Sequence, residues 1–453
     1  MDKNKLIKIA TIITQIFLIG LLLQFLLQTF VTYKLDQSNI FRTMIWMRKE
    51  VILLGLAGFL VYILQKSHQR KSIWESLAIK RFIRVFLITL IISFMASVFF
   101  NQGSISIYIV SIRYSMIGFF IFILFFVLAK IFFGAREMRL NDRYARIIKT
   151  LLIWSLIWRG IIRLMPNLLK FVGYNPYNYE GGISVAPPAA YYTQYDTGYV
   201  RNQFLFERPI SRGFFLVAFR PLFFVLCIKK KPLKEKFRRG SLYGLAILST
   251  FSRAAWIAWI VQIIILLILQ FRKRIWKLAI YRLLPMLIIF GGITYLGRDQ
   301  IISRDFSNTG HLRLILEAVK KIGARPIWGE GAGSAGPASF YLGPGKSYNP
   351  ENQYLQIWLE YGVFGFMGWM YLYLFLHRIG YKAYKDEKEQ PTQMVKQTRN
   401  YGLILFAFSL GILGLSVEGL VLHSFVDRMI VYPFMALFGI TYALYVKEKY
   451  SRQ

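Results

Sequence analysis

Residues 313–368 read RLILEAVKKIGARPIWGEGAGSAGPASFYLGPGKSYNPENQYLQIWLEYGVFGFMG, a polar, glycine-punctuated segment set between long apolar runs. The segment begins as a basic amphipathic helix and continues into a Pro-x-x-Gly-x-Gly-x-Gly turn that starts at Pro326. A loop follows, and then the sequence NPENQYL (349–355) before a glycine-rich helix start. The flanking runs are typical of membrane helices, so we expect the chemistry of this protein in the polar segment.

The composition predicts an all-α, polytopic membrane protein. Of 453 residues, 56% are hydrophobic and 17% aromatic, and the mean hydropathy is +0.44. Apolar runs long enough to cross the roughly 30 Å hydrocarbon core of a bilayer recur along the chain. The first run, 6–31, is too long for the apolar region of a signal peptide and is expected to be a retained helix. The single cysteine, Cys227, excludes an intrachain disulfide.

The net charge of +35 belongs to short loops and not to a nucleic-acid-binding surface. Lysine and arginine cluster in alternate connections between apolar runs, as the positive-inside rule requires. Both termini are then cytoplasmic, and the number of spans is even, about twelve. The expected spans are 6–31, 50–65, 83–100, 108–133, 148–166, 213–228, 241–252, 254–271, 278–296, 353–376, 401–417 and 428–446.

This topology makes residues 1–453 one membrane domain with two large extracytoplasmic loops, 167–212 and 297–352. Neither loop is long or apolar enough to form a core of its own, so both are expected to act as lids over a cavity in the membrane domain. The second loop is predicted to hold an amphipathic helix over 310–323, opened by a Thr309 cap. Its apolar face would carry Leu312, Ile315, Val319 and Ile322.

Several arginines lie on the predicted outer side, where the positive-inside rule does not explain them. A charge at membrane depth costs at least about 2.5 kcal/mol, so each needs a partner, a water-filled cavity or a route to the interface. Snorkelling or pairing with a structural carboxylate is one explanation, and for the helix arginine a solvated lid face is another. A cluster of guanidinium groups also suits the oxygens of a pyrophosphate. The candidates are Arg113, Arg208, Arg212, Arg253 and Arg313.

Gly329, Gly331 and Gly333 resemble a phosphate cradle, although three alternating glycines are a weak signal. A Walker A loop is excluded, because Phe340 stands where the first glycine of that motif would be. No Asp-x-Asp pair and no His/Cys cluster supports a metal site on the outer side.

Glu351 is the candidate general base, because it follows Pro350 at a junction between loop and helix. Its side chain can there point beneath the loop and take a proton from a substrate group. The alternative is an ordinary glutamate at a helix start, where the helix dipole favours the ionised form. Two histidines, His311 and His423, also fall on or near the outer side, and His423 or Asp427 is the next candidate base.

The order of these motifs resembles that of the bacterial O-antigen polymerase and ligase family. The similarity runs from about Tyr192 to Gly368 and includes an SR-A signature at 252–254. In ligases of the family a His-Asn-x-Tyr-Leu element carries the proposed catalytic histidine. Here the corresponding element, 351–355, reads Glu-Asn-Gln-Tyr-Leu, so a glutamate replaces the histidine.

The resemblance implies a membrane glycosyltransferase fold, a polyprenyl (undecaprenyl) pyrophosphate-linked glycan as donor and acceptor, no cofactor and no metal. Because a carboxylate replaces the histidine, we expect a polymerase that joins lipid-linked repeat units into a surface polysaccharide. The resemblance also implies that the protein lies in the cytoplasmic (inner) membrane of a bacterium, with its active site facing outside. A chain-length regulator is an expected partner. Glu351 would deprotonate the acceptor and the arginines would hold pyrophosphate, supported by Gly329, Gly331, Asn352 and Tyr354. A ligase acting on lipid A core or another acceptor, and a glycan transporter, are the alternatives.

Overall fold

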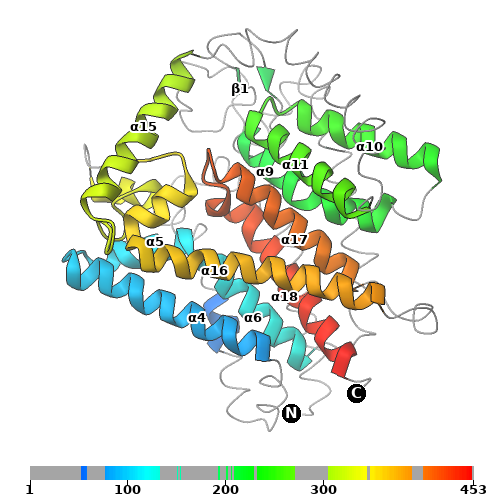
Figure 1. The fold of residues 1–453 in the computed structure, drawn as a ribbon, viewed down its shortest axis with the longest axis horizontal. Helices are drawn as coiled ribbons and strands as arrows, with labels where there is room; N and C mark the ends of the chain where they lie inside the picture. The colour runs from blue at the N-terminus through cyan, green and yellow to red at the C-terminus, as the bar shows by residue number, and fades with distance from the viewer. Residues whose placement is uncertain are drawn as a thin grey trace, which may run out of the picture.

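The computed structural model describes residues 53–58, 77–132, 209–228, 232–270, 305–343, 347–389 and 401–450, and the short pieces at 150, 154, 192–193, 200–201 and 206. This part of the chain is helical apart from a two-residue antiparallel pair in the first large loop, β1 (Tyr192–Thr193) and β2 (Val200–Arg201). The main elements are α4 (Leu77–Phe94), η2 (Met95–Phe100), α5 (Ile105–Ser115), α6 (Ile117–Phe132), α9 (Pro209–Phe223), η3 (Phe224–Ile228), α10 (Leu233–Leu248), α11 (Arg253–Gln270), α15 (Asp305–Ala324), η5 (Gly336–Leu342), α16 (Gln353–Glu389), α17 (Tyr401–Glu418), η6 (Ser424–Val426) and α18 (Arg428–Tyr450) (Figure 1).

Among the described helices, four are long and apolar enough to cross a membrane: Ala78–Phe100, Gln353–Glu389, Tyr401–Glu418 and Arg428–Lys449. The bent pair of α5 and α6 makes a fifth if it is one span. These helices fit an integral membrane protein, as the composition predicts. The expected spans 6–31, 148–166 and 278–296 lie wholly or almost wholly outside the described residues, so the number of about twelve stays a prediction.

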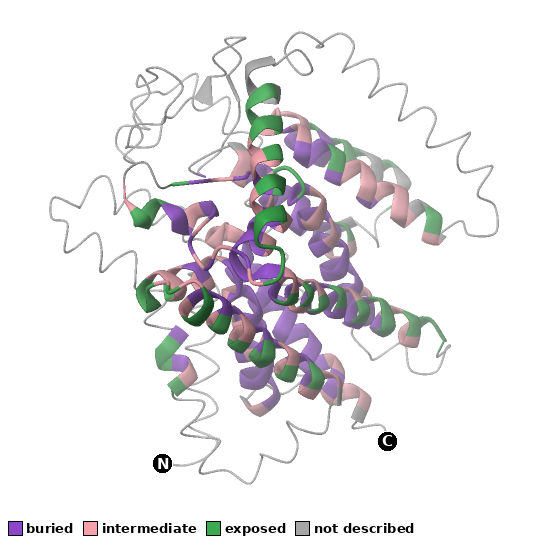
Figure 2. Cartoon of the chain, turned by 60° about the vertical axis from the view of Figure 1, so that its left-hand side comes forward, coloured by how far each residue is buried: buried purple, intermediate pink, exposed green. Residues whose placement is uncertain are grey.

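The spans pack closely because glycines stand where two helices cross. A Cβ at Gly439 of α18 would lie 2.4 Å from the carbonyl oxygen of Phe122 in α6. At Gly380, a Cβ would lie 2.6 Å from the Leu405 carbonyl oxygen of α17. Small residues are favoured at such crossings because lipid chains supply no hydrophobic drive and close van der Waals contact must replace it. The most buried residues accordingly lie in the middle of the bundle (Figure 2).

The expected span 108–133 is bent in the structure, because the chain breaks at Met116 and α5 and α6 meet at 66°. Ser115 Oγ donates to the Ser111 carbonyl oxygen one turn earlier, at 2.9 Å, a bond that bends helices. Ser111 Oγ in turn donates to Glu360 of α16, at 2.9 Å. α5 is therefore hydrogen-bonded to α16 through its serines, while the apolar α6 packs against α18.

The helix that begins near residue 353 is also not straight. Gly362 in α16 has φ 66° and ψ −175°, which interrupts the helix. The Pro326–Gly333 turn satisfies the backbone groups that the break frees. Val363 N–H donates to the Pro326 carbonyl oxygen at 3.0 Å, and Glu330 N–H donates to the Leu359 carbonyl oxygen at 2.7 Å.

The amphipathic helix of the second loop begins earlier than expected and is turned differently. α15 starts at Asp305, so Thr309 lies inside it and not at its cap. Ala318 and Ile322 are buried against the start of α16, whereas Leu312 and Val319 are 58% and 53% exposed. Figure 2 shows this exposed length of α15. The expected apolar face is therefore divided between the core and the outer surface.

Candidate functional site

The turn that carries Glu351 is anchored by Tyr348. Its backbone N–H donates to Ser339 Oγ at 3.0 Å, and its carbonyl oxygen accepts from Gly336 N–H at 2.8 Å. The phenol of Tyr348 donates to the Leu314 carbonyl oxygen of α15 at 2.6 Å. These bonds hold the turn, η5 and α15 together as one unit.

Glu351 itself has a left-handed backbone, with φ 50°, which is uncommon for a residue other than glycine. The next residue, Asn352, caps α16, because its Oδ1 accepts from the N–H groups of Tyr354 and Leu355, both at 3.0 Å. Glu351 therefore stands just before the helix. Its carboxylate pairs with Nδ1 of His311 on α15. Strained backbone held by its surroundings is frequent at functional sites.

His423 is a second candidate base beside this turn. Its Nε2 is hydrogen-bonded to Oδ1 of Asn349, and because an amide oxygen only accepts, we assign the proton to Nε2. Nδ1 then carries the lone pair, and it is buried without a hydrogen-bond partner in the described part of the chain. Burial lowers the pKa of His423 to about 4, against the opposing effect of the Glu351 charge. The imidazole is therefore neutral at pH 7.

The end of α17 is the place where the Glu351 turn meets the membrane bundle. Gln353 N–H donates to the Gly419 carbonyl oxygen at 2.9 Å, and Asn352 Nδ2 donates to the Leu420 carbonyl oxygen at 2.6 Å. Tyr354 donates from its hydroxyl to the Ser416 carbonyl oxygen at 2.7 Å. We call residues 416–428 the α17 terminus. Asn352 and Tyr354, expected to support the site, bind this segment directly.

The start of α9 reaches the α17 terminus from another side. A Cβ on Gly213 would lie 3.1 Å from Cβ of Ala255 and 3.7 Å from Oε1 of Glu418. The neighbouring Arg212 is buried and donates from Nη1 to Ser249 Oγ at 2.9 Å. The SR-A signature, 252–254, therefore lies against α9 at this terminus, with Arg253 half-buried as the first residue of α11.

The other predicted arginines are placed differently. Arg113 lies in the last turn of α5, which packs against η5 and η6, and the adjacent Tyr114 lies beneath the guanidinium of Arg428 at 5.4 Å. Arg313 is exposed on α15 and, two positions from His311, lies on a different face of that helix. Arg208 lies outside the described residues. Among the five arginines, therefore, Arg113, Arg212 and Arg253 come from elements that pack on the α17 terminus.

The positions of the expected phosphate cradle require glycine for structural reasons. Gly329 and Gly331 have φ 69° and 92°, and a Cβ on Gly329 would lie 2.4 Å from the Leu359 carbonyl oxygen. Two N–H groups of this loop point into the protein: that of Ala332 donates to Ser97 Oγ at 2.9 Å, and that of Gly333 donates to Glu360 at 2.8 Å. This favours a role in holding the loop on α16 over direct binding of phosphate.

Glu360 lies inside the expected span 353–376, is fully buried and accepts three hydrogen bonds. Its donors are Ser111 Oγ at 2.9 Å, Gly333 N–H at 2.8 Å and Gln356 Nε2 at 3.3 Å. A buried carboxylate needs such donors. Glu360 therefore ties α5, α16 and the glycine loop together. The sequence carried a signal for this contact: a glutamate inside one apolar helix, and two serines four positions apart, Ser111 and Ser115, in a second helix.

Two buried side chains next to the Glu351 turn lack hydrogen-bond partners in the described residues. They are Gln353, through both atoms of its amide, and Glu418, through both of its oxygens. Both are fully buried, and both adjoin Gly419. Most buried polar groups in native proteins are paired, so this pair marks a place suited to a polar ligand. Sequence reasoning missed Gln353 and gave Glu418 no role.

Within the described ranges, no three His, Cys, Asp or Glu side chains gather closely enough to hold a metal ion. The arrangement instead offers guanidinium groups, a carboxylate paired with a histidine, and a neutral imidazole. Such groups can neutralise an anion and move a proton.

Comparison with known proteins adds one match. Residues 241–370 match the family model described as O-antigen ligase. The match covers the SR-A signature, α15, the glycine loop and the Glu351 turn, and it ends in α16. It begins later than the resemblance near Tyr192 that the motifs indicate. No curated protein matches the chain. The resemblance to the O-antigen polymerase and ligase family is confirmed by this match over residues 241–370.

Proposed function

We propose that the protein is a polymerase that joins polyprenyl pyrophosphate-linked oligosaccharide units into a surface polysaccharide on the outer face of the cytoplasmic membrane. The family is one of O-antigen assembly. The observation that carries the proposal is the meeting of the Glu351 turn, the SR-A segment and the start of α9 at the α17 terminus. These segments are far apart in the sequence, and each brings a group that glycan transfer requires.

In this scheme Glu351 is the general base. It takes the proton of the acceptor hydroxyl as that oxygen bonds to the anomeric carbon of the donor. The bond from this carbon to the pyrophosphate oxygen breaks, and polyprenyl pyrophosphate leaves with the electron pair. His311 holds the carboxylate in place through its Nδ1. A direct displacement of this kind inverts the anomeric carbon.

The arginines stabilise the departing pyrophosphate. Arg212 is next to Gly213, whose Cβ position would lie 3.7 Å from Oε1 of Glu418, and Arg253 begins α11, whose Ala255 lies 3.1 Å from the same position. Arg113 belongs to α5, which packs against η6. Guanidinium groups placed where negative charge develops lower the barrier without a metal ion. Polymer formation is therefore expected to continue in the presence of EDTA.

The test is incubation of the purified protein with a synthetic polyprenyl pyrophosphate repeat unit, followed by gel analysis. A ladder of products supports a polymerase, and its absence with the parental protein contradicts one. The description of the matched family as O-antigen ligase favours transfer to a separate acceptor as the second candidate. A parallel reaction that contains lipid A core separates the two, since a ligase gives one discrete product on that acceptor and no ladder.

A further inference from the structure

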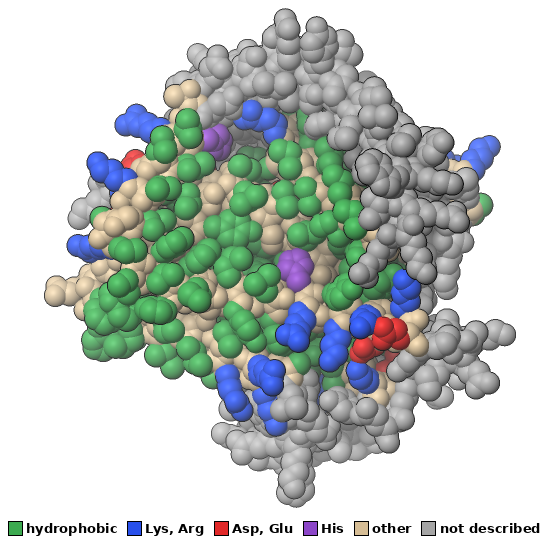
Figure 3. Space-filling view, viewed as in Figure 1, with side chains coloured by type: hydrophobic (Ala, Val, Ile, Leu, Met, Phe, Trp, Pro, Cys, Tyr) green, Lys and Arg blue, Asp and Glu red, His purple; other side chains and the backbone are tan. Residues whose placement is uncertain are grey.

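A second polar region lies at the opposite end of the same helices. α16 runs from the Glu351 turn to Glu389 and is long enough to cross a membrane. Arg378 and Lys382 lie near its far end, about four turns or more beyond the kink at Gly362. Figure 3 shows a belt of hydrophobic side chains between the basic residues at this far end and those near α15.

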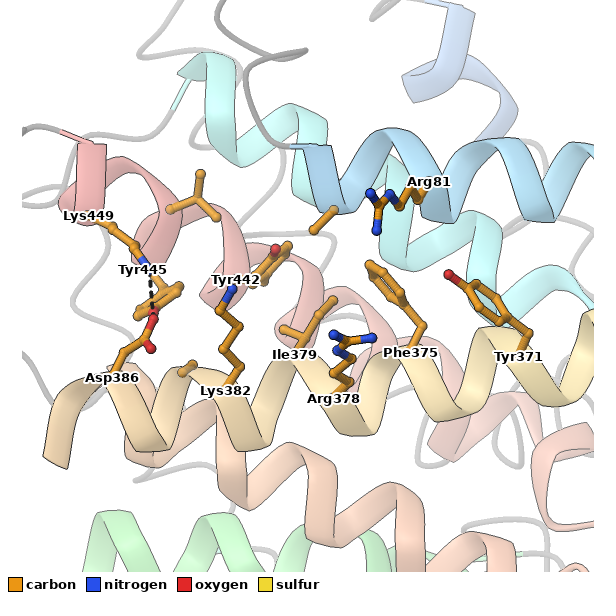
Figure 4. Close-up of a pocket in the computed structure, with 13 residues that line it drawn as sticks. Arg81, Tyr371, Phe375, Arg378, Ile379, Lys382, Asp386, Tyr442, Tyr445 and Lys449 are labelled. Carbon is orange, nitrogen blue, oxygen red and sulfur yellow. Dashed lines mark hydrogen bonds and ion pairs between the residues drawn. The ribbon is translucent and has the colours of Figure 1, made fainter. Parts of the chain in front are cut away.

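A cavity of about 380 Å³ opens at this far end, between α4, α16 and α18. Its volume is within the range of about 300–1,000 Å³ typical of small-molecule sites. In Figure 4, Arg81 of α4 and Arg378 and Lys382 of α16 point into the space between the two helices. Lys449 of α18 lines the same cavity. Charged residues of one sign therefore converge from separate spans.

The one acidic side chain of this cavity is already engaged. Asp386 accepts from Lys449 Nζ and from the hydroxyl of Tyr445, both at 2.7 Å. The side chains of Arg81, Arg378 and Lys382 make no hydrogen bond or ion pair with other described residues. Lys382 lies one turn from Asp386 and interacts with it only through the longer-range attraction of the two charges. Three cationic groups thus remain available to an anion.

The cavity also has an apolar side that continues into the lipid-facing surface. Tyr371 lines it two turns before Arg378, and Phe375 lines it two turns before Lys382, on the same face of α16. The adjacent Leu374 is 59% exposed, as a side chain facing lipid tails would be. A ligand lying along this face would meet aromatic rings first and cations at its far end.

We infer that this cavity binds the headgroup of an anionic glycerophospholipid, with the phosphate between Arg81, Arg378 and Lys382 and the acyl chains along Tyr371 and Phe375. Basic pockets between membrane helices suit such headgroups, and arginine can bind a phosphate through two parallel hydrogen bonds. A soluble anion would gain nothing from the apolar side. In the proposed orientation the lipid belongs to the cytoplasmic leaflet.

The experiment is native mass spectrometry of the full-length protein in detergent, titrated with phosphatidylglycerol, phosphatidylcholine or soluble glycerol 3-phosphate. Phosphatidylglycerol is expected to be retained preferentially by the parental protein. The double variant Arg378→Gln/Lys382→Gln should bind it about 25-fold more weakly, about fivefold for each charge. The matched control is Lys385→Gln/Lys388→Gln, which removes the same charge from exposed positions of the same helix and should bind within about twofold of the parental protein.

Equal retention of the two lipids, or equal loss in both double variants, would show only a general field of positive charge and would overturn the site. If glycerol 3-phosphate competes with the lipid at equal concentration, the lipid proposal is also overturned, because the cavity then binds a soluble anion. The melting temperature of each variant without lipid serves as the folding check, and because all four positions are exposed we expect it to be unchanged.

Discussion

The carboxylate of Glu351 is paired with Nδ1 of His311, so the turn before α16 is joined to the lid helix α15 by the group proposed to act as base. The two residues are 40 positions apart in the sequence, and nothing in their local patterns links them. The pairing gives Glu351 a fixed direction. It also makes the placement of α15 part of the proposed chemistry.

Replacing Glu351 by Gln should lower the rate of polymer formation by roughly 10²-fold to 10⁴-fold, because the amide keeps the shape but cannot accept the proton. Donor binding should change little, since the arginines hold the pyrophosphate. The measurement is the rate of ladder formation by purified protein. The control is Glu317→Gln, which removes a carboxylate from a partly exposed pair with Lys321 on α15. A parental rate in Glu351→Gln would transfer the base role to His423 or Asp427.

Replacing Arg253 by Lys should lower activity by about tenfold or more, because the charge stays while the planar fork for two phosphate oxygens is lost. Arg253→Ala should be weaker still. Membrane insertion should be normal in both. Arg238→Lys is the control, at a side chain that is 72% exposed on α10. Near-parental activity in both Arg253 variants would return this residue to an interfacial, structural role.

Replacing Gly362 by Ala should destabilise the protein by more than about 3 kcal/mol, because the position has φ 66° and the new Cβ would lie 1.9 Å from the Ile327 carbonyl oxygen. Gly310→Ala is the matched control, since nothing lies within 4 Å of its Cβ position. The measurement is the melting temperature and the yield of folded protein in detergent. Equal values for the two variants would contradict the close contact between α16 and the glycine loop.

His423 should make stability depend on pH. Its pKa is lowered by burial to about 4 in the folded protein, below the ordinary value of 6.5, so the unfolded chain binds more protons between these values. Neutral His423 therefore contributes up to about 3 kcal/mol to the free energy of unfolding. This contribution is complete above about pH 6.5 and is lost as the pH falls toward 4. Melting temperatures from pH 4 to pH 8 test this. The melting temperature should vary less with pH in His423→Gln than in the parental protein. An identical pH dependence in the two proteins would assign it to another group.

The orientation can be tested by labelling in a chain whose native Cys227 is replaced by Ser. A cysteine at Phe340, which is 64% exposed, should react with an impermeant thiol reagent in intact spheroplasts. A cysteine at the exposed Lys388 should react only after permeabilisation. Phe340 is the better probe in its region, since the nearby Ser339 is buried. The reverse pattern would place the Glu351 turn in the cytoplasm.

The helices at the C-terminal end were predictable because each is a long apolar run with polar ends. α17 was expected at 401–417 and lies at Tyr401–Glu418. The breaks at Met116 and Gly362 were not predictable, because their causes lie in distant partners. The 111–115 stretch bends toward Glu360, and Gly362 is required by the approach of Ile327.

The candidate site was likewise predictable in part. Arg212 and Arg253 could be selected as charged residues in or beside apolar runs. Glu351 could be selected because it follows Pro350 at a junction between loop and helix. Their common neighbour could not, because the α17 terminus supplies backbone carbonyl groups, at Gly419 and Leu420, that any sequence would offer. The same holds for Glu360, whose partners belong to a helix and a loop far away in the chain.

The kink at Gly362 divides α16 into two mechanical parts. The chain around the kink is bonded to the Pro326–Gly333 turn through Leu359 and Val363, and the start of α16 is bonded to the α17 terminus through Gln353. The residues further along α16 pack as a membrane span. The cover of the proposed active site therefore includes the first turns of a transmembrane helix. If this cover opens for a growing glycan, as the proposed function requires, Gly362 is the point at which α16 can bend, and the contacts of His311 and Tyr348 would carry α15 with it.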